Sequence, residues 1–232
     1  MIFIPTDNPT NELIKLLVKL TKKYNFENSK IVVINDYSKN PKSKQIYNII
    51  QKYGCTIIDN KNKKGKGAAI KYGIEYSISK KLPFALFTDG DGQHSADDIS
   101  KMYSLAHSNN KCIIGVRDFT NSPFLNKVAN KFSNFVFNLV TKINLKDTQC
   151  GLRLIPSNLY NILLDIKQNK FDFELISLFE ILSNNSHIKE LPIKTIYFEK
   201  KRITSFNKIV DTILIIKIFL IYFFSKKYFT KI

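Results

Sequence analysis

The sequence contains no tryptophan, only three histidines and only three cysteines. Cys55, Cys112 and Cys150 are odd in number and widely spaced, which excludes a disulfide framework and the paired spacings of structural zinc sites. The first residues, MIFIPTDNP, lack the basic start and the long apolar stretch of a signal peptide, so none is expected. These absences predict a protein with reduced thiols that stays in the cytosol or on its side of a membrane.

Acidic residues are also scarce: 19 Asp and Glu stand against 36 Lys and Arg, which gives a net charge of +17. A charge of this size favours an anionic partner such as nucleic acid, a phosphorylated ligand or a membrane surface. The chain is rich in Lys, Asn and Ile, so an AT-rich gene is an equally good explanation for much of the charge. A nucleic-acid-binding protein is one alternative, but the sequence contains no recognisable reader motif.

The 232 residues, 44% of them hydrophobic, suffice for one substantial core, and no linker or internal repeat divides them. Short apolar runs alternate with segments that carry apolar residues at helical spacing. Strands are expected at 2–5, 30–36, 55–59, 83–89, 111–118, 147–156 and, as an edge strand, 190–200. Helices are expected at 11–24, 42–53, 66–80, 97–108, 124–142 and 171–182. This alternation predicts an α/β fold with a mostly parallel central sheet flanked by helices.

The most apolar stretch of the chain is 209–224. As a helix it would rise about 24 Å, less than the ~30 Å of a hydrocarbon core, and it contains Asp211 and Lys217. Lysines and aromatic residues flank it, which favours a helix in or on a membrane; a core-packing helix and a spanning helix remain open. We therefore expect one domain over 1–203 and a membrane-associated apolar helix over 204–232.

Charged residues collect where the predicted strands end: Asp7, Asp36, Asp89 with Asp91, and Arg117 with Asp118. Ligands of parallel sheets bind beyond the carboxyl ends of the strands, so these residues predict a site. In FTDGDGQH (87–94) two carboxylates stand one residue apart, and such acids repel each other unless a cation lies between them. Oxygen ligands at this spacing suit Mg or Mn.

Other uses of paired acids fit this segment less well. An EF-hand loop needs an oxygen ligand and a glycine where Gln93 and His94 stand. A phosphatase of the haloacid dehalogenase type continues with Thr or Val in the place of Gln93. A structural turn explains the glycines but neither the two carboxylates nor the glutamine.

The segment TDGDGQHSADDI (88–99) resembles the D-x-D-G-Q-H segment of family 2 glycosyltransferases, and in particular the polyprenyl-phosphate sugar transferases of the dolichyl-phosphate mannosyltransferase type. The resemblance continues in order through IPTDNP, VINDYS, NKKGKGAAIKYGI, IIGVRDF, NKVANKFSN, DTQCGLRLIP, FDFELI and ITSFNKIVDTILI. The chain departs from the pattern at Asp7, Pro9 and Asn35, where the family usually has an aromatic residue, an acid and an aspartate. These departures keep an inactive, binding-only member as an alternative.

The resemblance implies a single GT-A domain and a metal-dependent, inverting transfer from a nucleotide-diphosphate sugar to a polyprenyl (dolichyl or undecaprenyl) phosphate. It implies Mg or Mn held by Asp89, Asp91 and Gln93, with Asp91 and Gln93 making more of the direct contact. The catalytic residues would be Asp89, Asp91 and Arg117, because a metal and a rigid guanidinium both stabilise charge on phosphate oxygens.

The same resemblance assigns the two substrates to different residues. The nucleotide sugar would contact Pro5, Asp36, Lys66 and Asp89, with GDP and UDP both open. The acceptor phosphate would contact Arg117, Lys131 and Arg202, although a solvated helix face explains Lys131 nearly as well.

A GT-A transferase that acts on a glycan hydroxyl in surface polysaccharide synthesis is the alternative. That acceptor would need a general base, for which Asp147 and Glu174 are candidates, each with an equally good structural role. A lipid acceptor would place the protein on the cytoplasmic face of a membrane, peripherally or through its C-terminal helix. A separate membrane protein is then expected for anchoring or lipid flipping, and nucleic acid is not an expected partner.

Overall fold

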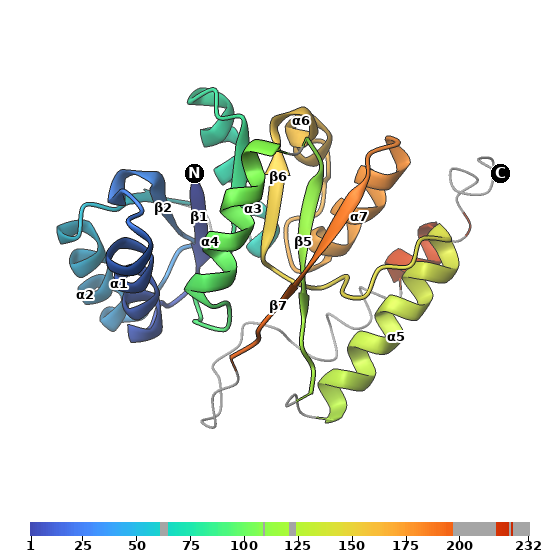
Figure 1. Cartoon of the computed structure of the whole chain (residues 1–232), viewed down its shortest axis with the longest axis horizontal. Coiled ribbons are helices and arrows are strands. Elements are labelled where there is room, and N and C mark those ends of the chain that lie inside the picture. Colours follow the sequence, from blue (N-terminus) through green and yellow to red (C-terminus); the bar gives the residue numbers. More distant parts are fainter. Residues whose placement is uncertain (61–64, 109, 121–123, 197–216, 223, 225–232) are drawn as a thin grey trace.

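The computed structural model describes residues 1–60, 65–108, 110–120, 124–196, 217–222 and 224. Its centre is a seven-stranded sheet with the order β3-β2-β1-β4-β6-β5-β7 (Figure 1). The strands are β1 (Ile2–Thr6), β2 (Ile31–Asn35), β3 (Thr56–Asp59), β4 (Phe84–Phe87), β5 (Cys112–Arg117), β6 (Arg153–Pro156) and β7 (Ile188–Ile193). All paired neighbours are parallel except that β6 runs antiparallel to both β4 and β5. The predicted α/β class and mostly parallel sheet are confirmed, as a mixed sheet.

Helices cover both faces of this sheet. They are α1 (Asn11–Tyr24), α2 (Pro41–Lys52), α3 (Lys66–Ser79), α4 (Ala96–Ser104), α5 (Phe124–Thr141), α6 (Tyr160–Leu164) and α7 (Asp172–Ser183). Apolar side chains of α1, α2 and α4 form one core with one face of the sheet, and those of α3, α5, α6 and α7 form a second core with the other. Strands β1, β2 and β4 are almost wholly buried, as expected for strands covered on both sides.

The predicted strand over 147–156 is wrong in its first part. Only Arg153–Pro156 are extended in the sheet, and residues 147–152 form an irregular loop. The reason is that side chains in this loop, Asp147 and Thr148 among them, hydrogen-bond to α5 and β5 in place of a strand ladder. Because β6 is antiparallel, the loop that precedes it lies at the edge where the parallel strands end.

Most of the predicted C-terminal helix lies outside the described residues, as does the predicted domain boundary at 203/204. Residues 217–222 are helical, and Ile218 and Phe219 are buried in the core shared by α5 and α7. Tyr222 stacks on Phe179 of α7, with ring centroids 4.2 Å apart. No helix in the described part of the chain is long and apolar enough to cross a membrane, so the predicted membrane helix is not found there.

Candidate functional site

The carboxyl edge of the sheet carries the loop Thr88–Gln93, which follows β4 directly. Gly90 is buried against β1, where an added Cβ would lie 3.2 Å from a methyl carbon of Ile4, and Gly92 has a φ of +80°. The Asp91 carboxylate accepts a hydrogen bond from the backbone amide of Gln93 at 2.9 Å, which fixes the end of the loop. The glycines therefore let the chain turn sharply, so that Asp89, Asp91 and Gln93 all stand at this edge with partly exposed side chains.

Lys66, the first residue of α3, forms ion pairs with two carboxylates. Its Nζ lies 2.6 Å from Oδ1 of Asp89 and 3.0 Å from Oε1 of Glu174 on α7. Burial lowers the pKa of Lys66, but the two carboxylates outweigh burial and raise it above its usual value. One ammonium thus faces two carboxylates, and this cluster keeps a net negative charge.

The loop 147–151 packs directly on the Asp89 carboxylate. A Cβ added to Gly151 would lie 2.8 Å from Oδ1 of Asp89 and closer still to Oδ2. Gly151 is therefore needed for space, since its backbone φ is not in the left-handed region.

Arg117, the last residue of β5, is held by Asp147 of the same loop. Its Nε donates to Oδ2 of Asp147 at 2.7 Å and its terminal nitrogen to Oδ1 at 3.0 Å. The Asp147 carboxylate also accepts from the backbone amides of Arg117 and Gln149 and from the Asn130 amide of α5. Burial raises the pKa of Asp147, but its bonds and charge contact with Arg117 outweigh burial and lower it, so Asp147 stays ionised.

A buried histidine joins the two parts of the site. Nδ1 of His94 lies 3.0 Å from the Thr88 hydroxyl and accepts from the Asp89 amide at 3.4 Å, and Nε2 lies 3.8 Å from Sγ of Cys150. Burial lowers the pKa of His94, which keeps its ring neutral near pH 7. His94 and Cys150 thus tie the Asp89 loop to the loop 147–151.

Asp36 and Pro5 lie on the neighbouring strands of the same edge. Asp36 is buried and accepts from the Asn60 amide at 3.0 Å, and Pro5 pairs with Ile34 in the register of β1 and β2. Asn35, which departs from the family pattern, donates to Asp59 at 2.8 Å and accepts from the Tyr47 hydroxyl at 2.9 Å. An aspartate at position 35 would face the Asp59 carboxylate with no proton to donate, which explains the asparagine.

One predicted site residue, Lys131, is not brought into this arrangement. Lys131 is exposed on α5, as the solvated-face alternative expects, and Arg202 lies outside the described residues. Sequence reasoning missed Asn130, His94 and Gly151. The first supports Asp147, and the other two set the position of Asp89. All three lie inside the segments that carry the family resemblance, so a signal for them was present.

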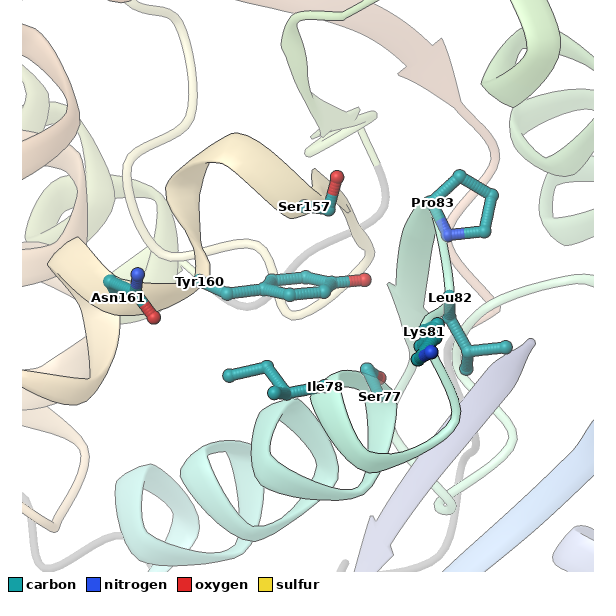
Figure 2. Close-up of a pocket in the computed structure, with 8 residues that line it drawn as sticks. All are labelled: Ser77, Ile78, Lys81, Leu82, Pro83, Ser157, Tyr160 and Asn161. Carbon is teal, nitrogen blue, oxygen red and sulfur yellow. The ribbon is translucent and has the colours of Figure 1, made fainter.

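A cavity of about 350 Å³ lies at the opposite edge of the sheet (Figure 2). It is lined by Ser77, Ile78, Lys81, Leu82, Pro83, Ser157, Tyr160 and Asn161. Its walls are the end of α3, the start of β4 and the start of α6 with the turn before it, whereas the site residues stand where β4 ends. None of the predicted site residues lines this cavity, so we place the candidate site at the carboxyl edge.

Comparison with known proteins identifies the chain. The profile described as Glycosyl transferase family 2 matches residues 1–163. The chain belongs to this family. The protein is a glycosyltransferase, as the resemblance in its sequence predicts.

The individual proteins that this chain resembles are distant from it in sequence. An uncharacterised protein of Methanocaldococcus jannaschii is 30% identical over 164 residues, which cover 66% of this chain and 70% of that protein. The UDP-N-acetylglucosamine–dolichyl-phosphate N-acetylglucosaminyltransferase of Methanococcus voltae is 26% identical over 222 residues, which cover 85% of this chain and 86% of that one. Glucosyl-3-phosphoglycerate synthase of Mycobacterium tuberculosis, solved with Mn²⁺, UDP-glucose and phosphoglyceric acid, superposes with a TM-score of 0.67 at 8% identity and covers 97% of this chain and 78% of that one. At that identity the superposition shows the fold alone, and the fold is that of GT-A transferases.

The oxygen-bearing side chains at the carboxyl edge of this family 2 transferase are of the kind that binds a divalent cation. Within the described residues, no group of three or more His, Cys, Asp or Glu side chains is placed to hold a metal. The predicted ligands are instead the carboxylates of Asp89 and Asp91 and the side-chain amide of Gln93. All three offer the hard oxygen atoms that Mg and Mn prefer. The net negative charge that Lys66 leaves on Asp89 and Glu174 favours a cation at the same place.

Proposed function

We propose that this protein transfers a sugar from a nucleotide-diphosphate sugar to a polyprenyl phosphate, with inversion at the sugar and with a divalent cation. The observation that carries the choice of acceptor is the state of the two candidate bases. Asp147 is fully buried with five donors on its carboxylate, and Glu174 is buried and paired with Lys66. A general base would have to give up these partners, whereas a phosphate acceptor is already ionised and needs no base.

In the proposed reaction the acceptor phosphate oxygen forms a bond to C1 of the sugar as the bond from C1 to the nucleoside diphosphate breaks. Asp36 would bind the nucleoside, and Lys66 stands beside the Asp89 carboxylate, where the diphosphate is expected. When bound, the cation held by Asp89, Asp91 and Gln93 would supply charge neutralisation for the departing diphosphate. Arg117, held rigid by Asp147, would orient the acceptor phosphate.

The known proteins support the finer parts of this proposal. The Methanococcus voltae relative is named for a UDP-sugar donor and a dolichyl-phosphate acceptor. The mycobacterial structure, similar in fold, contains Mn²⁺ and UDP-glucose. We therefore favour UDP over GDP and Mn²⁺ or Mg²⁺ as the cation. A lipid acceptor and cytosolic nucleotide sugars would together place the enzyme on the cytoplasmic face of a membrane.

A transfer assay tests the proposal. Purified protein would be incubated with Mn²⁺ or Mg²⁺ and labelled UDP- and GDP-sugars, with and without polyprenyl phosphate. We expect label in the organic phase only when lipid and cation are both present. Donor hydrolysis without a lipid product would favour the glycan hydroxyl acceptor, and no reaction from folded protein would favour a binding-only member.

The variant Asp91→Ala tests the metal assignment in the same assay. We expect activity to fall by about 10²–10³-fold or more, because one charge stabiliser of the departing group is lost. Asp165→Ala, an exposed carboxylate just past the end of α6, is the matched control and should keep full activity. Retained activity in Asp91→Ala, with an unchanged melting temperature, would contradict the assignment.

A further inference from the structure

Helix α5 is apolar on two faces. Its inner face packs in the core, where the rings of Phe137 and Phe179 lie 4.6 Å apart. Its outer face, here named the α5 stripe, consists of four exposed side chains: Val128 (48%), Phe132 (54%), Phe135 (64%) and Leu139 (60%). A surface helix ordinarily turns polar residues outward, so a second apolar face indicates that something covers it.

The spacing of the α5 stripe makes it one continuous surface. Its members follow one another at intervals of four, three and four residues, which places them on one side of a helix. Ile143, just past the helix end, is also exposed and apolar. Single exposed apolar residues are normal, whereas a row of two phenylalanines, a leucine and a valine marks an interaction surface.

The helical residues 217–222 add to the same part of the molecule. Phe219 and Tyr222 pack on Phe179, the residue that also receives the inner face of α5, while Leu220 and Ile221 are more than half exposed. Figure 1 shows α5 at one end of the molecule and α1 and α2 at the other. Exposed apolar residues therefore gather around the α5 end.

Charge decides which partner fits. From 119 to 146 the sequence contains four lysines and no Asp or Glu, and Lys131, Lys142 and Lys146 are all exposed. Lysines beside an apolar helix face match anionic headgroups above acyl chains, because the lysine stems extend along the apolar surface and the ammonium groups reach the phosphates. A second copy of this chain, also at +17, would bring lysines against lysines.

We propose that the α5 stripe docks on a bilayer containing anionic phospholipids, with the helix axis in the plane of the membrane. From Val128 to Leu139 the helix rises about 17 Å, which suits an in-plane helix and is well short of a ~30 Å hydrocarbon core. This surface differs from the segment 204–232, to which the sequence alone assigns membrane contact.

The placement also connects the membrane to the site. Asn130, buried on the inner side of α5, donates to Asp147, which holds Arg117. A bilayer on the outer face of α5 would thus lie about one helix diameter, ~10 Å, from these residues. A lipid phosphate could then reach Arg117 while its chain stays in the membrane; this step rests on the proposed function, whereas the docking surface does not.

Vesicle binding by the full-length protein tests the docking surface without donor or acceptor. We expect binding to vesicles of phosphatidylcholine with phosphatidylglycerol, weakened by salt, and much less binding to phosphatidylcholine alone. The double variant Phe132→Ser/Phe135→Ser should lower the partition coefficient at least about tenfold. Ile49→Ser/Tyr53→Ser, exposed apolar residues on and just after α2, is the matched control and should bind as the unaltered protein does.

The absence of tryptophan provides a second readout. Phe135→Trp and Tyr53→Trp each create a protein with a single tryptophan, one on the α5 stripe and one beyond α2. We expect only the tryptophan at position 135 to shift its emission to the blue and to be quenched by brominated acyl chains when anionic vesicles are added.

Two results would overturn the inference. One is equal vesicle binding by the stripe variant and the control, or an emission spectrum at position 135 that vesicles leave unchanged. The other is a dimer in solution that Phe132→Ser/Phe135→Ser dissociates, which would make a second copy the occupant. Vesicle binding without any sugar transfer would contradict the proposed function alone, and transfer in detergent without vesicle binding would contradict the docking surface alone.

Discussion

Two ion-paired clusters meet at the loop 147–151, and they are built in opposite ways. Around Asp147, one fully buried carboxylate accepts from five donors and its charge is matched by Arg117. Around Lys66, one ammonium is shared by Asp89 and Glu174, with 17% of the Lys66 side chain and 26% of the Asp89 side chain exposed. The first cluster is closed and neutral, and the second is open and negative.

The difference separates a structural pair from an exchangeable one. A carboxylate with every lone pair in use cannot accept a proton or a ligand, so Asp147 serves by holding Arg117 in place. An ammonium that faces one partly exposed carboxylate, Asp89, and one buried carboxylate, Glu174, can release Asp89 when a cation or a diphosphate arrives. We infer that the closed cluster supports the acceptor side of the site and that the open cluster is where charge changes during the reaction.

Removing the closed pair should have the largest effect on stability. Asp147→Ala leaves Arg117 without its carboxylate, and we expect a loss of about 3–5 kcal/mol in the free energy of unfolding, together with loss of transfer. Denaturant unfolding measures the first quantity. Asp165→Ala, an exposed carboxylate just past the end of α6, is the control and should cost less than about 0.5 kcal/mol.

The pH dependence of Asp147→Ala gives an independent check. Because the folded-state pKa of Asp147 is lowered, its contribution is present above its ordinary pKa of about 4 and is lost as the pH falls below that value. Part of the acid-induced loss of stability below pH ~4 should therefore be absent in the variant. Parallel stability curves for variant and unaltered protein would show that Asp147 is not the stabilising group inferred here.

Crowding the contact between the two clusters should have an intermediate effect. Gly151→Ala places a Cβ on both oxygens of Asp89, and we expect a loss of about 1–3 kcal/mol with weaker cation binding. In an Asp89→Ala background the same substitution should cost much less, because the group it strikes is gone. A cost that is equal in both backgrounds would show that Gly151 is required for some other reason.

The sequence allowed much of this arrangement to be predicted. The apolar runs gave β1 to β5 nearly to the residue, and parallel strands must end at one edge, so Asp36, Asp89 and Arg117 were expected there together. The direction of β6 was not predictable in the same way. Its four residues carry no pattern that distinguishes an antiparallel from a parallel strand, and the sequence predicts a strand that also includes the polar residues before them.

The pairings within the site also lay beyond the sequence. Asp147 is 30 residues from Arg117 and 17 from Asn130, and Lys66 is 108 residues from Glu174, so only the folded chain brings them together. Asp147 and Glu174 were candidate bases because carboxylates can accept protons. Their burial and existing partners, which the sequence alone does not reveal, favour the structural role instead.

Loosening the open cluster should have its clearest effect on cation binding. Lys66→Met removes the ammonium and leaves the buried Glu174 carboxylate without its partner, so we expect a cost of about 1–3 kcal/mol without cation. The folded-state pKa of Lys66 is raised, so its contribution to stability is full below its ordinary pKa of about 10.4 and disappears only as the pH rises through the folded value.

With the ammonium gone, Asp89 and Glu174 keep more negative charge, and Mn²⁺ should raise the melting temperature more in Lys66→Met than in the unaltered protein. Lys71→Met, on the same helix but bonded to oxygens of Ile166 and Asn169, is the control and should respond to Mn²⁺ as the unaltered protein does. An identical Mn²⁺ response in all three proteins would mean that Lys66 and the cation do not share the Asp89 carboxylate, and the open cluster would then be as fixed as the closed one.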